Sequence, residues 1–81
     1  MVKIYGSMLC KDCVQCRKEL DAAGVSYLYL DFSDDLKNLK EFLAMRDQNS
    51  IFDKVRASGG IGIPCVVKED GSITLDWAEC M

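Results

Sequence analysis

The stretch that decides the fold runs from residue 2 to residue 32 and reads VKIYGSMLCKDCVQCRKELDAAGVSYLYLDF. Residues 2–5 alternate apolar and β-prone side chains, which is typical of a short strand. Residues 11–23 contain no Gly or Pro, repeat apolar side chains at helical steps and stop at Gly24, which predicts a helix. Residues 25–32 are rich in aromatic and β-branched side chains, and we expect a second strand that is mostly buried. This order predicts a βαβ unit with two parallel strands.

A second helix is predicted after this unit. Ser33 or Asp34 is expected to cap its start, and the helical pattern continues to about Arg46. A further helical turn or two is expected near Phe52, before the Gly59-Gly60 break. Apolar and charged positions of the second helix separate into two faces. We expect Leu36, Leu39, Phe42 and Leu43 on the inner face and Lys37, Lys40 and Glu41 on the outer face.

The last part of the chain predicts a β-hairpin. Residues 65–68 and 72–75 read as strands, and an Asp70-Gly71 tight turn lies between them. The few residues after Leu75 leave room for a single turn of helix. The expected order is therefore β-α-β-α-β-β, in a single α/β domain of 81 residues with a mixed four-stranded sheet.

Composition excludes several classes of protein. Hydrophobic residues make up 49% of the chain and charged residues 28%, which is typical of a globular domain and not of a disordered one. The net charge is −3 and the basic residues are scattered, so we do not expect nucleic-acid binding. No basic segment leads into a long apolar run, and no run approaches the ~20 apolar residues of a membrane span. We therefore expect a cytoplasmic monomer that does not bind membranes.

The segment Cys10-Lys11-Asp12-Cys13 lies where the first loop meets the first helix. Unpaired N–H groups and the positive end of the helix dipole stabilise a thiolate at this place, so Cys10 is the candidate nucleophile. Cys13 follows one helical turn later, close enough to attack a mixed disulfide on Cys10. This placement predicts that Cys13 is the resolving thiol.

A second Cys-x-x-Cys segment, Cys13 to Cys16, overlaps the first. If Cys13 began the helix, the preceding loop would be longer and the helix shorter, so we favour the earlier pair. Cys16 shares an apolar stripe with Leu20 and Ala23, and a free cysteine in such a stripe commonly serves as a small buried hydrophobe. We therefore expect a structural role for Cys16.

Three further segments of this chain recur together in one group of proteins. Residues 5–13 match the pattern Tyr-Gly-Ser-x-x-Cys-x-Asp-Cys, residues 39–47 match Leu-Lys-x-Phe-Leu-x-x-Arg-Asp, and residues 62–64 read Gly-Ile-Pro. In these segments the chain resembles the glutaredoxins, small members of the thioredoxin fold, and above all the small bacterial glutaredoxin-related proteins. The resemblance implies a thioredoxin-like fold and a thiol–disulfide oxidoreductase that serves electron transport and needs no metal or organic cofactor.

The resemblance also implies roles for individual residues. Cys10 matches the family's nucleophile and Cys13 its resolving cysteine. Pro64 matches a proline that the family holds in the cis form, and Ile63 matches the residue whose backbone pairs with the substrate. The candidate substrate-binding residues are therefore Ile63, Pro64 and Lys11. Lys11 is included because it places a positive charge beside Cys10. From the residues alone, Pro64 reads equally well as a trans proline at the start of a strand.

The partner implied is a protein with a disulfide or a small thiol substrate. Glutathione is the less favoured partner. Ser7 stands where glutathione-binding members carry Lys, and no Gly-Gly pair follows Leu75. These departures argue against specific glutathione binding.

Two other functions are compatible with the cysteines. Cys10, Cys13 and Cys16, with Cys65 as a fourth ligand, would form a zinc or iron–sulfur module. Against this, the chain has no His, and three cysteines spread along one helix do not converge. A redox-inactive adaptor with the same fold is the second alternative. We expect Cys65 to be a buried strand thiol, although its position after Pro64 also allows it to lie near Cys10, and we expect Cys80 to be exposed.

Overall fold

The four strands form one mixed sheet in the order β2-β1-β3-β4. The computed structural model describes all 81 residues and gives the strands as β1 (Val2–Gly6), β2 (Tyr27–Asp31), β3 (Cys65–Val67) and β4 (Ile73–Thr74). β1 and β2 are parallel, whereas β3 is antiparallel to both β1 and β4. The predicted α/β class and mixed four-stranded sheet are confirmed.

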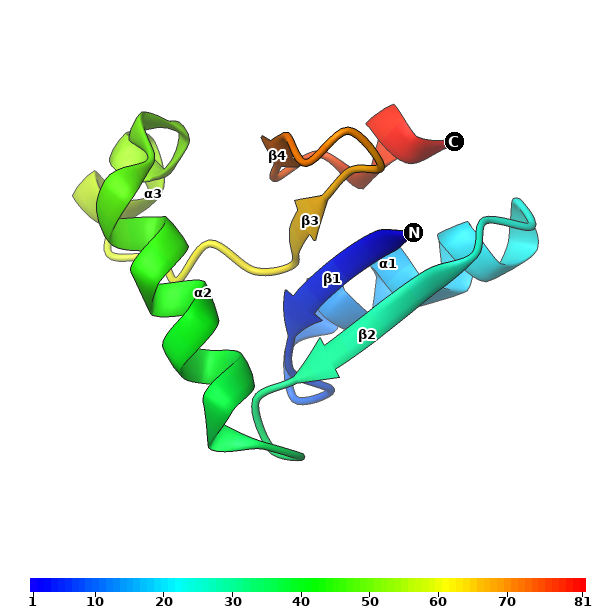
Figure 1. Cartoon of the computed structure of the whole chain (residues 1–81), viewed down its shortest axis with the longest axis horizontal. Coiled ribbons are helices and arrows are strands. Elements are labelled where there is room, and N and C mark those ends of the chain that lie inside the picture. The colour runs from blue at the N-terminus through cyan, green and yellow to red at the C-terminus, as the bar shows by residue number, and fades with distance from the viewer.

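Three α-helices surround this sheet (Figure 1). The helix α1 (Lys11–Ala22) connects β1 to β2, and α2 (Leu36–Gln48) follows β2. A 3-10 turn, η1 (Ser50–Phe52), leads into the short α3 (Asp53–Ala57), and a second, η2 (Trp77–Cys80), ends the chain. The predicted order of strands and helices is therefore confirmed. None of the helices combines the length and apolar character needed to cross a membrane.

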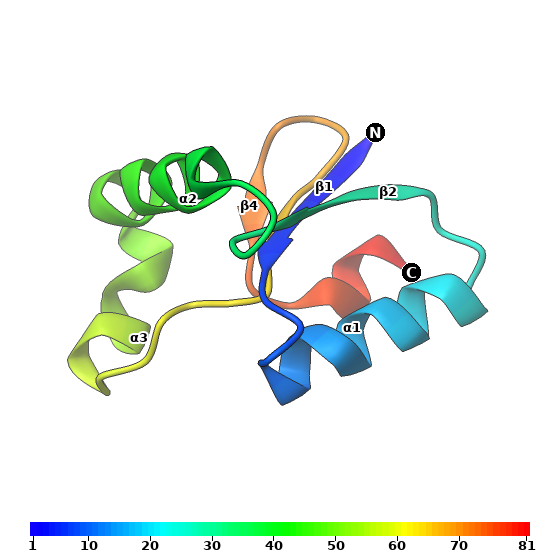
Figure 2. The ribbon, with the colours of Figure 1, turned by 90° about the horizontal axis from the view of Figure 1, so that it is seen from below.

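The core has two parts, one on each face of the sheet. Figure 2 shows α1 and α2 on opposite sides of the strands. Side chains of β1 alternate between the faces, so Ile4 packs toward α1 while Tyr5 packs toward α2. The α1-side cluster consists of Val2, Ile4, Cys16, Leu20 and Val66. The α2-side cluster consists of Tyr5, Phe42, Phe52 and Cys65.

The expectation that the second strand is mostly buried is wrong. β2 is an edge strand, and within it only Asp31 is buried. Leu28 is 46% exposed and pairs in register with Lys3, which is also exposed. Both side chains lie on the face away from α1, and α2 does not extend over this end of the strands.

The start of α2 differs from the prediction. Asp35 is the N-cap, and its side chain accepts a hydrogen bond of 2.9 Å from the Lys37 amide. Ser33 and Asp34 instead belong to the preceding turn, in which the Asp31 carboxylate accepts a hydrogen bond of 2.7 Å from the Ser33 amide. The Asp31 carbonyl also accepts from the Asp34 amide, so Ser33 and Asp34 are held in this turn and the helix begins after them.

The inner face of α2 is also narrower than predicted. Phe42 is fully buried, with Leu39 and Met45 one turn to each side, but Leu36 is 62% and Leu43 41% exposed. Leu36 is the first residue of the helix. Leu43 directly follows the buried Phe42, so its side chain is turned by roughly 100° around the helix axis from that of Phe42. Glu41, predicted to face outward, is half-buried and accepts a hydrogen bond from Tyr5.

Candidate active site

Cys10 is the N-cap of α1, one residue before the first helical position. A tight turn sets it there, because the Cys10 amide donates to the Ser7 carbonyl and the Leu9 amide donates to the Ser7 hydroxyl. Its own carbonyl accepts the first bond of the helix, from the Val14 amide at 3.1 Å. The Cys10 side chain makes no capping hydrogen bond and is half-buried. The thiol is therefore free to react and reachable from solvent.

Cys13 lies one helical turn later, beside the Cys10 thiol, and is fully buried. Burial raises the pKa of Cys13 to about 11; contact with the Ser7 backbone lowers it, and the Cys10 side chain raises it. Cys13 is therefore a neutral thiol at neutral pH. The geometry gives an accessible thiol next to a protected one, in the order predicted from the sequence.

Gly6 and Tyr29 complete the wall around Cys13, and the sequence analysis missed both. A Cβ atom on Gly6 would lie 2.7 Å from Cys13 Sγ and 2.9 Å from the Tyr29 hydroxyl oxygen. Only a residue without a side chain allows β1 to approach both groups. The guanidinium carbon of Arg17 lies 4.4 Å from the centre of the Tyr29 ring, a cation–π contact. In the sequence, the one sign of this close approach was Gly6 itself, which lies between the predicted strand and the Cys10–Cys13 segment.

A groove of about 460 Å³ opens beside Cys10. One wall is formed by Ser7 and Leu9 and the other by residues 60–63, which precede β3. Its apolar side chains are unusually accessible, with Leu9 94% and Ile61 58% exposed, and no charged side chain lines it. Gly62 has a φ of +98°, and a Cβ there would lie 2.8 Å from the Phe52 ring, so this wall needs glycine to pack closely.

The candidate substrate-binding residues fall in three different environments. Ile63 lines the groove together with Cys10. Pro64 is buried and is not among the residues that line the groove, and the Ile63–Pro64 peptide bond is cis, as predicted. Lys11 is exposed at the start of α1 and is not among the residues that line the groove. A substrate contact from Lys11 stays a prediction.

The other three cysteines do not join this site. Cys16 is fully buried in the α1-side cluster, which confirms its prediction, and burial raises its pKa to about 12. Cys65 is fully buried on the opposite face of the sheet, as a strand thiol. The expectation of an exposed Cys80 is wrong, because this residue is half-buried against the α1-side cluster. The predicted apolar stripe of α1 ends at Leu20, since Ala23 is exposed at the C-cap.

The ligands of the alternative metal module are separated by the sheet. Cys65 packs among Tyr5, Phe42 and Phe52, whereas Cys16 packs on the α1 side. No three Cys, His, Asp or Glu side chains lie close enough together to hold a metal ion. The four-cysteine arrangement considered from the sequence is therefore not formed.

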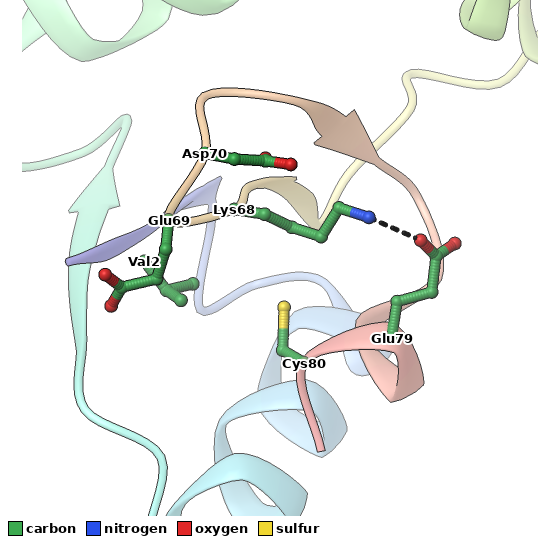
Figure 3. Close-up of a pocket in the computed structure, with 6 residues that line it drawn as sticks. All are labelled: Val2, Lys68, Glu69, Asp70, Glu79 and Cys80. Atoms are coloured by element: carbon green, nitrogen blue, oxygen red, sulfur yellow. Dashed lines mark hydrogen bonds and ion pairs between the residues drawn. The ribbon is translucent and has the colours of Figure 1, made fainter.

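A second cavity, of about 340 Å³, lies near the β3–β4 turn and the C-terminal η2, with Cys80 and Val2 in its wall (Figure 3). Lys68, its one basic residue, is engaged in an ion pair of 2.8 Å with Glu79. Burial raises the pKa of the Cys80 thiol, which disfavours its reactive form. This cavity therefore offers weaker chemistry than the groove at Cys10.

Comparison with known proteins finds a relative of this chain. The chain is 37% identical over 76 residues to an uncharacterized protein of Haemophilus influenzae, and the match covers 94% of this chain and 88% of that protein. The chain belongs to the same family as this protein. No protein-family model matches the chain, and no solved structure matches it.

Proposed function

We propose that this protein is a glutaredoxin-like thiol–disulfide oxidoreductase with a thioredoxin-like fold. The observation that carries the proposal is the pair at the start of α1. Cys10 is an accessible thiol at the helix N-cap, and Cys13 is a buried thiol directly beside it. An apolar groove lies next to Cys10, with Ile63 in its wall. These features together match the chemistry of a dithiol that reduces disulfides.

The reaction has two exchange steps. In the first, the Cys10 thiolate attacks one sulfur of the substrate disulfide, a mixed disulfide forms, and the other substrate sulfur leaves as a thiolate. In the second, the Cys13 thiolate attacks Cys10 Sγ and displaces the remaining substrate sulfur. The substrate disulfide is reduced, and the Cys10–Cys13 pair is oxidised. A separate thiol reductant must then restore the pair.

The groove favours a disulfide-bonded protein as the substrate. Its lining is neutral and its rim carries the exposed side chains of Leu9 and Ile61, which suits an apolar polypeptide segment. Glutathione carries two carboxylates, and the groove offers no cation to pair with them. The backbone N–H and C=O of Ile63 make no backbone hydrogen bond, so both are free to pair with an extended substrate segment. We infer that the protein acts as a cytoplasmic monomer in electron transport.

The test is the reduction of a disulfide-bonded protein by the wild type and by Cys10→Ser and Cys13→Ser. Cys10→Ser should abolish the activity, and Cys13→Ser should form a mixed disulfide that persists. The Cys10→Ser variant retaining activity, with Cys13 alkylated first, would overturn the assignment. In the second arm, the oxidised protein is incubated with glutathione or with a thioredoxin reductase, to find the reductant that resets the pair.

Metal analysis, together with the same reduction assay, separates the proposed function from the two alternatives. A zinc or iron–sulfur module would show bound metal after anaerobic purification, and Cys16→Ala would lose that metal. An iron–sulfur cluster would also show a visible absorption spectrum. A redox-inactive adaptor would reduce no disulfide in either assay, even with both thiols intact. Reduction of the protein substrate by metal-free wild type excludes both alternatives together.

A further inference from the structure

The hydroxyl of Tyr29 is a buried polar group without a nitrogen or oxygen partner. The side chain that acts on it most directly is the neutral thiol of Cys13, a weak acceptor. By contrast, the hydroxyl of Tyr27, on the same strand, accepts from Arg17 at 3.3 Å and donates to Asp21 at 2.8 Å. A buried hydroxyl without a hydrogen bond is unfavourable for folding and is rare in proteins. In the resting state, with Cys13 neutral, this oxygen therefore contributes little to stability.

The nearest reactive group to this hydroxyl is the Cys13 thiol. The Gly6 Cβ position, 2.7 Å from Cys13 Sγ and 2.9 Å from the Tyr29 oxygen, places the two groups next to each other. Because residue 6 is glycine, no side chain separates them. Cys13 is fully buried, so water does not reach its sulfur to supply a hydrogen bond.

The surroundings of Tyr29 keep its hydroxyl in the donor form. Burial raises the pKa of Tyr29 well above its ordinary value, and the neighbouring Cys13 raises it further. The Arg17 guanidinium rests on the Tyr29 ring at 4.4 Å and holds the ring in place. Tyr29 is therefore protonated throughout the neutral range and acts as a hydrogen-bond donor, not as a base.

We propose that Tyr29 positions and stabilises the resolving thiolate, by donating its hydroxyl hydrogen to Cys13 Sγ as negative charge develops there. This inference rests on the proposed function. When Cys13 attacks Cys10 Sγ, the Cys10–Cys13 bond forms and the bond from Cys10 to the substrate sulfur breaks. The electron pair leaves with the substrate sulfur, which takes up a proton in place of the one that Cys13 released. Tyr29 keeps its own proton throughout.

A hydrogen bond to a thiolate is stronger than one to a neutral thiol, because the acceptor is charged. Tyr29 thus supports the second step and has no part in the first. The titratable or charged groups that face Cys13 and Tyr29 are Cys10, Cys16 and Arg17 from α1 and Asp31 from β2. Tyr29→Phe and its control Tyr27→Phe leave all four of these groups in place.

The test uses 5,5′-dithiobis(2-nitrobenzoate), an aromatic disulfide that releases one coloured thiolate when Cys10 attacks and a second when Cys13 resolves. All variants carry Cys80→Ala, which removes the other partly accessible thiol. Tyr29→Phe should leave the first release unchanged and slow the second roughly tenfold near neutral pH, the size of effect expected for one hydrogen bond to a charged group. The midpoint of the pH dependence of the second release should move to higher pH.

A matched control and a stability measurement separate this role from a structural one. Tyr27→Phe removes a hydroxyl from the same strand and should leave the second release unchanged. Tyr29→Phe removes an oxygen that has no nitrogen or oxygen partner, so the urea midpoint should change little. An unchanged second release in Tyr29→Phe, or equal slowing in both variants, overturns the proposal for Tyr29.

Failure of the proposed function is recognised separately in the same assay. It would appear as a first release that survives Cys10→Ser, or as a second release that survives Cys13→Ser. With both of these controls behaving as expected, an effect of Tyr29→Phe on the second release alone assigns the residue to the resolution step.

Discussion

The hydroxyl of Tyr5 in β1 donates a hydrogen bond of 2.9 Å to Oε1 of Glu41 in α2. The two residues are 36 positions apart in the sequence, so this contact ties α2 to the central strand of the sheet. Burial and, to a smaller extent, the hydrogen bond to Glu41 together raise the pKa of Tyr5 to about 12. The contact lies on the same face of the sheet as Cys65 and Phe42, away from Cys10.

Tyr5→Phe should lower the free energy of unfolding by about 1–2 kcal/mol, because a partly buried hydrogen bond to a carboxylate is lost. Glu41→Gln keeps an acceptor oxygen and should cost less. Urea midpoints of the two variants and the wild type provide the comparison. Equal stability of Tyr5→Phe and the wild type would mean that this contact does not hold α2 on the sheet.

Alkaline pH should lower the stability of the folded state, because that state buries thiol and hydroxyl groups in their neutral form. Burial raises the pKa of Cys16 and of Cys65 from 9.0 to about 12, and that of Tyr5 from 10.0 to about 12. The unfolded state therefore loses these protons first. Their contribution to stability is complete below the unfolded pKa of 9.0 and is lost as pH rises through the folded values.

The measurement is the urea midpoint in reducing buffer at a series of pH values, which should fall progressively above about pH 9. Cys65→Ala should have a lower midpoint at neutral pH but a shallower alkaline decline, since one titrating group is removed. A decline that is as steep in the variant as in the wild type would contradict the assignment of this effect to buried thiols.

Cys16→Ala tests the structural role of the third cysteine in α1. It removes one sulfur from the α1-side cluster and should cost on the order of 1 kcal/mol. Disulfide reduction should survive, since Cys10 and Cys13 are intact. Turnover, bound metal and the urea midpoint are to be measured on this one variant. Lost turnover with an unchanged midpoint would refute the structural role and favour Cys13 and Cys16 as the working pair.

Gly6→Ala should disturb the packing of β1 against Cys13. The added Cβ would lie 2.7 Å from Cys13 Sγ, so the thiol or the strand must shift, at a cost of about 1–3 kcal/mol. We expect Cys13 to become alkylated in the native state, as measured by mass spectrometry. Gly71→Ala is the control, because that position is strained at a φ of +87° but has no atom near an added Cβ. It should destabilise the hairpin without exposing Cys13.

Asp35→Ala should destabilise the protein by about 1 kcal/mol, because the side chain that accepts from the Lys37 amide is lost from the N-cap of α2. Asp34→Ala is the matched control one residue earlier, in the turn, and should change stability by less than about 0.5 kcal/mol. Thermal unfolding of both variants distinguishes the two positions. The reverse order of effects would restore Asp34 as the cap.

Local patterns in the sequence determined the order of the strands and helices and the position of the cysteine pair. Strand alternation, helical periodicity and the Gly24 stop are properties of residues that are neighbours in the sequence. They can therefore be recognised without knowing how the strands and helices pack together. The burial of Cys16 followed from its three- and four-residue spacing to Cys13 and Leu20, which places all three on one face of a helix. The cis state of Pro64 was different, because the residues alone allowed both forms and only the family resemblance favoured cis.

The tertiary structure alone decided what covers each surface and what lies beside each thiol. Leu28 is exposed because α2 does not extend over its position, and Leu36 is exposed at the first position of α2. The length and placement of α2 over the sheet are not local properties. The approach of Tyr29 to Cys13 depends on the pairing of β2 with β1 across Gly6, between residues that are distant in the chain. A motif specifies which thiols are close in sequence, whereas the packing of the sheet against α1 decides which other groups can act on them.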